Sequence, residues 1–288
     1  MRKALILPAV SVAGGVVGLA VRQLYLRQAF EPGTGLPVSG QPVTGGLWAV
    51  AIVTAVAIVL LSGGKHRTFE KNYVRAFGGG SLIQTAGVLA GAVLLVLGGF
   101  FNIAAYVQAP VDFYTQAKTV SIVRPVLGVV SLLAGAGLWF LLQKVRARGK
   151  IPVGWSLMPG FACCLWVMAN YQQWAQDPVL ERYLFCLLAV LLSMVACYCL
   201  PGFVFGKGQV RLTVVTCLLA AAFSIMVLGD GLPLMDVALY LAMVFYLLSM
   251  ASVLLDNDAK PEPVLPPNCG GSCQGCPGCG PVEGPKEG

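Results

Sequence analysis

The chain has 288 residues, of which 57% are hydrophobic and only 11% are charged, and its mean hydropathy is +0.80. A soluble domain carries about 25% charged residues, so this composition excludes a water-soluble globular protein. The formal net charge of +7 comes from Lys and Arg in short loops beside apolar stretches. Such charges set membrane topology, and we expect no nucleic-acid partner.

Eight stretches are long and apolar enough to cross a bilayer, because the hydrocarbon core needs about 20 residues of helix. They are Ala4–Val21, Gly46–Leu61, Ser81–Tyr106, Ile122–Leu142, Val153–Tyr171, Tyr183–Phe205, Val210–Leu228 and Leu232–Leu255. The sequence therefore predicts an all-α fold, a polytopic transmembrane helix bundle of about eight spans in a lipid bilayer. We expect residues 1–256 to form this bundle and residues 257–288 to form a disordered cytoplasmic tail rich in Pro, Gly and Cys.

The first span has a second interpretation. Arg2 and Lys3 precede an apolar run, as they would in a cleaved signal peptide. We favour a retained helix, because the run is longer than a usual signal-peptide core and no clear small-x-small site precedes Arg22. Pro8 interrupts this span and Pro159 the fifth, which neighbouring helices can accommodate.

Lys and Arg alternate between the two sides of the predicted bundle. One side would carry 14 of the 19 basic residues, chiefly in the loops Lys65–Arg75 and Lys144–Lys150. Basic loops stay in the cytoplasm, so we expect both termini to be cytoplasmic. Short loops and the lack of eukaryotic sorting signals favour a bacterial cell (inner) membrane. Apart from its basic loops, this cytoplasmic side offers few candidate functional residues.

Four of the ten cysteines fall in the last 20 residues. They are Cys269, Cys273, Cys276 and Cys279, in the spacing C-x3-C-x2-C-x2-C. The cytosol keeps thiols reduced, and soft thiolates select zinc, copper(I) or an iron–sulfur cluster. The spacing therefore predicts a metal site. The alternative is an inert, disordered Cys-rich tail, because a Pro-rich connector precedes the cysteines and cannot pack a core.

Polar and aromatic side chains concentrate near the outer ends of the spans. The candidate outer-face ligand site consists of Asn102, Tyr106, Trp166, Asn170 and Asp230. Polar groups at membrane depth point to function. The alternative is a plain interfacial belt, since Trp and Tyr gather at membrane surfaces in any case.

Asp236 has its own structural interpretation. It lies just inside the last span and near two arginines expected on the same side. We expect it to pair either with Arg124 or with Arg182, because a charge inside the membrane seeks a partner.

Enzyme signatures are missing from the spans. The single histidine, His66, falls in a basic loop, and no paired acidic residues occur in the middle of any span. The chemistry therefore disfavours an enzyme, including one acting on lipid. We predict a transporter or permease-like subunit for a small molecule or metal. The alternative is a membrane-embedded sensor or scaffold whose four-Cys tail binds metal or reports redox state, with a protein partner at the cytoplasmic face.

Overall fold

The computed structural model describes residues 2–31, 36–38, 40–64, 66, 69, 73–111, 120–147, 149, 152–174 and 179–260. Its helices are α1 (Arg2–Gln28), α2 (Pro42–Leu61), α3 (Tyr73–Phe77), α4 (Leu82–Gln108), α5 (Val123–Arg146), α6 (Val153–Trp174), α7 (Leu184–Cys199), α8 (Val210–Val227) and α9 (Leu234–Asp258). Two 3₁₀ turns, η1 (Leu180–Tyr183) and η2 (Leu200–Phe203), flank α7. Over this part of the chain there is no β-strand, and an isolated bridge joins Phe30 and Pro37.

Eight of these helices are long and apolar enough to cross a membrane, which confirms the all-α, multi-pass fold. The chain is therefore an integral membrane protein. The helix ends differ in detail from the predicted spans. Helix α1 continues to Gln28 rather than ending near Val21, so Arg22 lies in a helix and not in a loop. The short helix α3, inside a predicted loop, was not expected.

Local chemistry explains several helix ends. The side chain of Ser81 accepts from the backbone N–H of Gln84, and the Gln84 side chain accepts from the backbone N–H of Ser81. This reciprocal capping box starts α4. Lys144 and Arg146 fall in the last turn of α5, where positive charge suits the helix dipole. Asp236 falls in the first turn of α9, where negative charge interacts favourably with the helix dipole.

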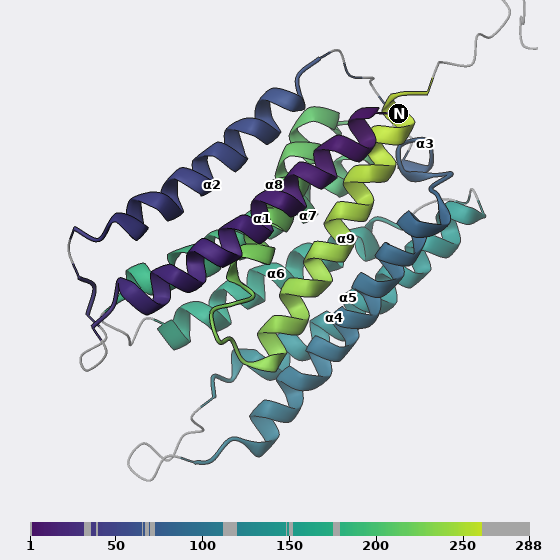
Figure 1. The fold of residues 1–288 in the computed structure, drawn as a ribbon. Coiled ribbons are helices and arrows are strands. Elements are labelled where there is room, and N and C mark those ends of the chain that lie inside the picture. The colour runs from purple at the N-terminus through teal and green to yellow at the C-terminus, as the bar shows by residue number, and fades with distance from the viewer. Residues whose placement is uncertain are drawn as a thin grey trace, which may run out of the picture.

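Helices α4 to α9 form a ring in chain order. Each packs against the next, and α9 closes the ring by packing against α4. Helix α1 packs on α8 outside this ring, and α2 packs on α1. Figure 1 shows α2 at one edge, followed by α1, α9 and then α4 with α5. The buried residues of α2 are Leu47, Ala51, Thr54 and Ile58, which share one helix face, so its other faces are left for lipid.

Glycine allows the closest approach between ring helices. A Cβ on Gly99 of α4 would lie 2.6 Å from the carbonyl oxygen of Gly128 of α5. A Cβ on Gly128 would lie 2.7 Å from the carbonyl oxygen of Gly99. The two backbones therefore touch where neither residue carries a side chain, as small residues permit in membrane helices.

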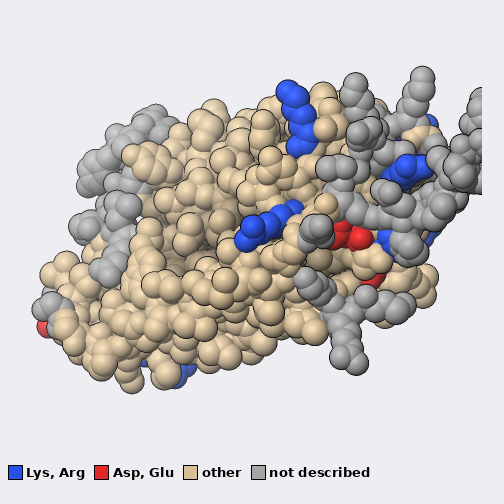
Figure 2. Space-filling view, turned by 90° about the horizontal axis from the view of Figure 1, so that it is seen from above, with Lys and Arg blue, Asp and Glu red and all other residues tan. Residues whose placement is uncertain are grey.

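Charge divides the two ends of the bundle. Helices α4, α6 and α8 begin, and α5, α7 and α9 end, at what we call the basic end. Basic residues at this end include Arg75, Lys144, Arg146, Lys207, Arg211 and Lys260. Figure 2 shows most of the exposed Lys and Arg towards this end. The other end is called the opposite end. Which end faces the cytoplasm stays a prediction.

Candidate functional site

A buried ion pair joins α5 to α9 at the opposite end. Nη1 of Arg124 donates to Oδ1 of Asp236 at 2.7 Å, and its Nη2 donates to Oδ2 at 3.2 Å. The two side chains are 2% and 4% exposed. Charges taken this far from water are tolerated only when they are paired and hydrogen-bonded. We expected Asp236 to pair with either Arg124 or Arg182, and the structure confirms the pair with Arg124.

Three amide side chains surround the Arg124 guanidinium, and each offers its oxygen. Asn102 of α4 accepts at 3.3 Å, Asn170 of α6 at 2.9 Å and Gln173 of α6 at 2.8 Å. Asn102 is itself held by a bond from its Nδ2 to the carbonyl oxygen of Gly98 at 2.8 Å. The three amide oxygens are neutral acceptors, so among the described partners of Arg124 the carboxylate of Asp236 supplies the opposite charge.

Trp166 of α6, one turn before Asn170, completes this group. Its Nε1 donates to Oδ1 of Asp236 at 2.8 Å, and its ring packs against Tyr240 with centroids 4.4 Å apart. Helices α4, α5, α6 and α9 are thereby tied together by polar contacts. We call this set the Arg124 cluster: Asn102, Arg124, Trp166, Asn170, Gln173 and Asp236.

A second buried ion pair lies at the same end. Nε of Arg22 donates to Oδ1 of Asp230 at 3.1 Å, and its Nη2 donates to Oδ2 at 2.9 Å. The thiol of Cys186 also donates to Oδ2 of Asp230, at 3.1 Å. The guanidinium carbon lies 5.0 Å from the centre of the Phe185 ring, within cation–π range. Arg22, Cys186 and Asp230 form what we call the Arg22 cluster.

Tyr240 connects the two clusters. Its ring contacts Trp166 of the Arg124 cluster, and its hydroxyl donates to the backbone carbonyl oxygen of Cys186 at 3.0 Å. Tyr240 also lies one helical turn after Asp236 on α9. A polar layer thus extends across the opposite end from α1 through α7 and α9 to α5.

The residues predicted as an outer ligand site all lie at the opposite end, but in different places. The structure brings Asn102, Trp166 and Asn170 together in the Arg124 cluster. Asp230 lies in the Arg22 cluster, and Tyr106 is half-buried one turn beyond Asn102 on α4. Their binding of a ligand stays a prediction.

Sequence reasoning missed Arg22 and Gln173. Arg22 looked like a loop residue because it follows the first apolar run. Leu24, Tyr25 and Leu26 continue the apolar character past it, and this signal could have shown that the helix goes on. Gln173 carried no such signal, because a glutamine near a helix end is ordinarily solvated.

A cavity of about 1240 Å³ lies at the basic end, which the sequence did not predict. It is bounded by α3, by the first turns of α4, by the last turns of α5 and by the second half of α9. Its buried wall is mainly apolar and includes Phe77, Val88, Leu138, Leu141, Tyr246 and Met250. Its rim is exposed at Gly79 and Arg146. We call it the basic-end cavity.

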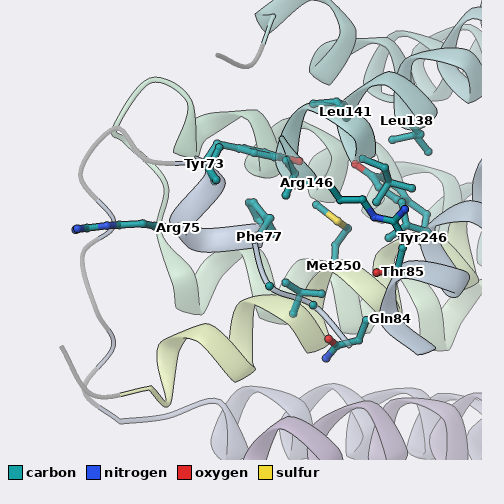
Figure 3. A pocket seen from close by; sticks show the side chains of 18 of the residues that line it. Tyr73, Arg75, Phe77, Gln84, Thr85, Leu138, Leu141, Arg146, Tyr246 and Met250 are labelled. Carbon is teal, nitrogen blue, oxygen red and sulfur yellow. The ribbon is translucent and has the colours of Figure 1, made fainter. Parts of the chain in front are cut away.

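The charged residues in the described lining of the cavity are arginines. Arg75 and Arg146 both line the cavity, and none of the lining residues that the structure describes is acidic. Figure 3 shows the Arg146 side chain extending into the cavity, towards the side where Thr85 and Tyr246 lie, whereas Arg75 points away. Lys260 adds positive charge at the rim, since its Nζ would lie 3.8 Å from a Cβ on Gly79. Arg146 and Lys260 therefore place positive charge at the mouth.

The phenol of Tyr73 lines the same cavity as a neutral group. Burial raises its pKa above the usual range, with a smaller contribution from nearby Cys217. Desolvation penalises the phenolate, so Tyr73 adds no negative charge to the wall.

The last turn of α9 holds the mouth of the cavity in place. Nδ2 of Asn257 donates to the carbonyl oxygens of Ala76 at 2.9 Å and Gly78 at 2.8 Å. Nε2 of Gln84 donates to Asp256 at 2.5 Å. These bonds fasten α3 and the start of α4 to α9, and the two bonds of Asn257 satisfy a side chain that would otherwise be buried without a partner.

The predicted metal ligands Cys269, Cys273, Cys276 and Cys279 lie outside the described residues, as does the connector before them. A metal site there stays a prediction, as does the division into a bundle and a tail. Comparisons with protein-family models, curated proteins and solved structures find no match to this chain.

Proposed function

We propose that the chain is a membrane transporter whose substrate site is the basic-end cavity and whose opposite end opens and closes at the Arg124 cluster. One observation carries this proposal: α4, α5 and α9 bound a cavity at one end and are tied by buried polar contacts at the other. An accessible cavity on one side and a sealed layer on the other are what alternating access requires in any single state.

The size and lining of the cavity support this function. Small-molecule sites occupy about 300–1,000 Å³ and combine apolar walls with a few polar groups. The basic-end cavity, at about 1240 Å³, exceeds this range and has such a lining. A structural void would be smaller, because packed interiors leave few gaps larger than a water molecule.

The chemistry of the seal supports it as well. Replacing a buried ion pair by well-packed apolar residues is often neutral or stabilising, so the pair is not needed for stability alone. Four residues accept five hydrogen bonds from Arg124, and all four can bond to water instead when the helices separate. An apolar contact cannot separate without exposing its surface to water. A polar seal is therefore suited to opening.

Thiol labelling tests the coupling between the two ends. Cys163, which is fully buried on α6 towards the middle of the bundle, reports on the opposite end when the other nine cysteines are changed to Ser. A Thr85→Cys variant without native cysteines reports on the cavity. A membrane-impermeant maleimide is added to each face of the membrane in turn.

We expect Thr85→Cys to be labelled from the basic end and Cys163 to be protected. Arg124→Ala, which unlocks the seal, should expose Cys163 from the opposite end and at the same time slow labelling of Thr85→Cys. Arg27→Ala, an exposed arginine at the same end, is the matched control and should change neither rate. If Cys163 becomes exposed while labelling at residue 85 stays unchanged, the bundle has only loosened and the transporter proposal is wrong.

A further inference from the structure

The charge and the lining of the basic-end cavity bear on which class of molecule it binds. We infer that it binds an amphiphilic anion, a molecule with one apolar chain and one carboxylate or phosphate head. The inference rests on the proposed function, because it names the substrate class of that site. The head would lie at Arg146 and the chain against the wall that contains Leu138 and Met250.

Arg146 is placed to select an anion. Its side chain extends into the cavity (Figure 3), and among the described residues it makes no hydrogen bond or ion pair of its own. A guanidinium offers five donors in a planar fork that matches carboxylate and phosphate oxygens. The charged side chains among the described lining residues are those of Arg75 and Arg146, which favours an anionic ligand over a cationic one.

The wall selects for an apolar chain. Leu138 and Leu141 of α5 line the cavity together with Tyr246, Met250 and Val253 of α9. An apolar chain that leaves water to lie against this wall gains about 25 cal/mol for each Å² of its apolar surface that is removed from water, and an ion without a chain has no such gain. Met250 adds an unbranched side chain that adapts to chains of different shape.

Equilibrium binding of radiolabelled oleate to the full-length chain in phosphatidylcholine nanodiscs tests the inference. Three competitors separate the chemical features: lysophosphatidate carries a phosphate head, oleyl alcohol has the chain without charge, and inorganic phosphate has the charge without a chain. We expect saturable oleate binding that lysophosphatidate displaces and that oleyl alcohol and phosphate do not. The relative affinities of the two anions also distinguish the source of the head group. Tighter binding of oleate indicates a free fatty acid, and tighter binding of lysophosphatidate indicates a phospholipid.

Two variants locate the site. Arg146→Gln should weaken oleate binding about tenfold or more, since one charge-assisted contact is lost. Arg211→Gln, the same change at an exposed residue of the basic end that does not line the cavity, should bind as the parent does. Met250→Trp, which fills the apolar part, should abolish binding. If this variant fails to fold, Arg146→Gln alone decides, because Arg146 is exposed.

Several results would overturn the inference: equal displacement by oleyl alcohol, displacement by inorganic phosphate alone, no saturable binding, or unchanged binding in Arg146→Gln. Its failure is separable from failure of the proposed function. Alternating thiol labelling without oleate binding removes only the substrate class. Oleate binding without alternating labelling keeps the site and removes transport.

Discussion

Asp230 and Asp236 lie on either side of the start of α9, and each carboxylate pairs with a different buried arginine. Asp230 holds Arg22 from α1, and Asp236 holds Arg124 from α5. Between them, Gly231 has φ of +68°, a left-handed conformation that glycine adopts without strain. One tight turn thus fastens the first helix and the middle of the chain to the same end of the bundle.

The Arg124–Asp236 pair should show the behaviour of a buried ion pair. Asp236→Leu leaves the Arg124 guanidinium buried without its counter-ion, and Arg124→Met leaves the Asp236 carboxylate so. Each variant should therefore lower the free energy of unfolding by roughly 3–5 kcal/mol. The double variant removes both charges and should recover most of this loss. Unfolding in mixed micelles by SDS titration measures all three. A double variant less stable than either single one would contradict this account.

The contact between α4 and α5 should depend on the absence of side chains. Gly128→Ala places a methyl group against the backbone of Gly99, so we expect a destabilisation of about 1–3 kcal/mol, the usual range for overpacking. Gly154→Ala on α6 is the matched control, because nothing lies within 4 Å of its Cβ position. The control should be neutral or more stable by up to about 1 kcal/mol, as alanine favours helix. Equal thermal midpoints for the two variants would rule out the close contact.

Asn257 should control the mouth of the basic-end cavity. Asn257→Ala removes the donors to Ala76 and Gly78, so we expect α3 to exchange its amide hydrogens faster and oleate binding to weaken. Ser252→Ala, which loses only a bond within α9, should leave both unchanged. Hydrogen–deuterium exchange over residues 73–80 measures the effect. Unchanged exchange there would mean that α3 is held by its apolar contacts alone.

The tail prediction can be tested without knowledge of its structure. The protein purified anaerobically should contain near-stoichiometric zinc, copper or iron by mass spectrometry, because four thiolates bind soft metals. Changing Cys269, Cys273, Cys276 and Cys279 to Ser should remove this metal. Equal, substoichiometric metal in both proteins would show that the tail does not form a metal site.

The sequence by itself determined the number of spans and the helical fold. Runs such as Val210–Val227 are predominantly apolar, and in lipid a backbone must satisfy its own hydrogen bonds, so such a run forms a helix. Lys and Arg placement also predicted that charge would divide the two ends. It was less informative at helix ends, where Arg22 and α3 show that polarity alone does not locate the boundary.

For the candidate site, the sequence could indicate which polar residues share an end but not which of them meet. Arg124 and Asp236 are 112 residues apart, and Arg22 and Asp230 are 208 apart. Whether such groups pair depends on which helices become neighbours. The basic-end cavity was still harder to predict from the sequence. Its wall combines residues of α3, α4, α5 and α9, and none of these residues is unusual in its own segment. Only the tertiary structure decided these features, since packing between helices distant in sequence determines both where a charge finds its partner and where a space is left unfilled.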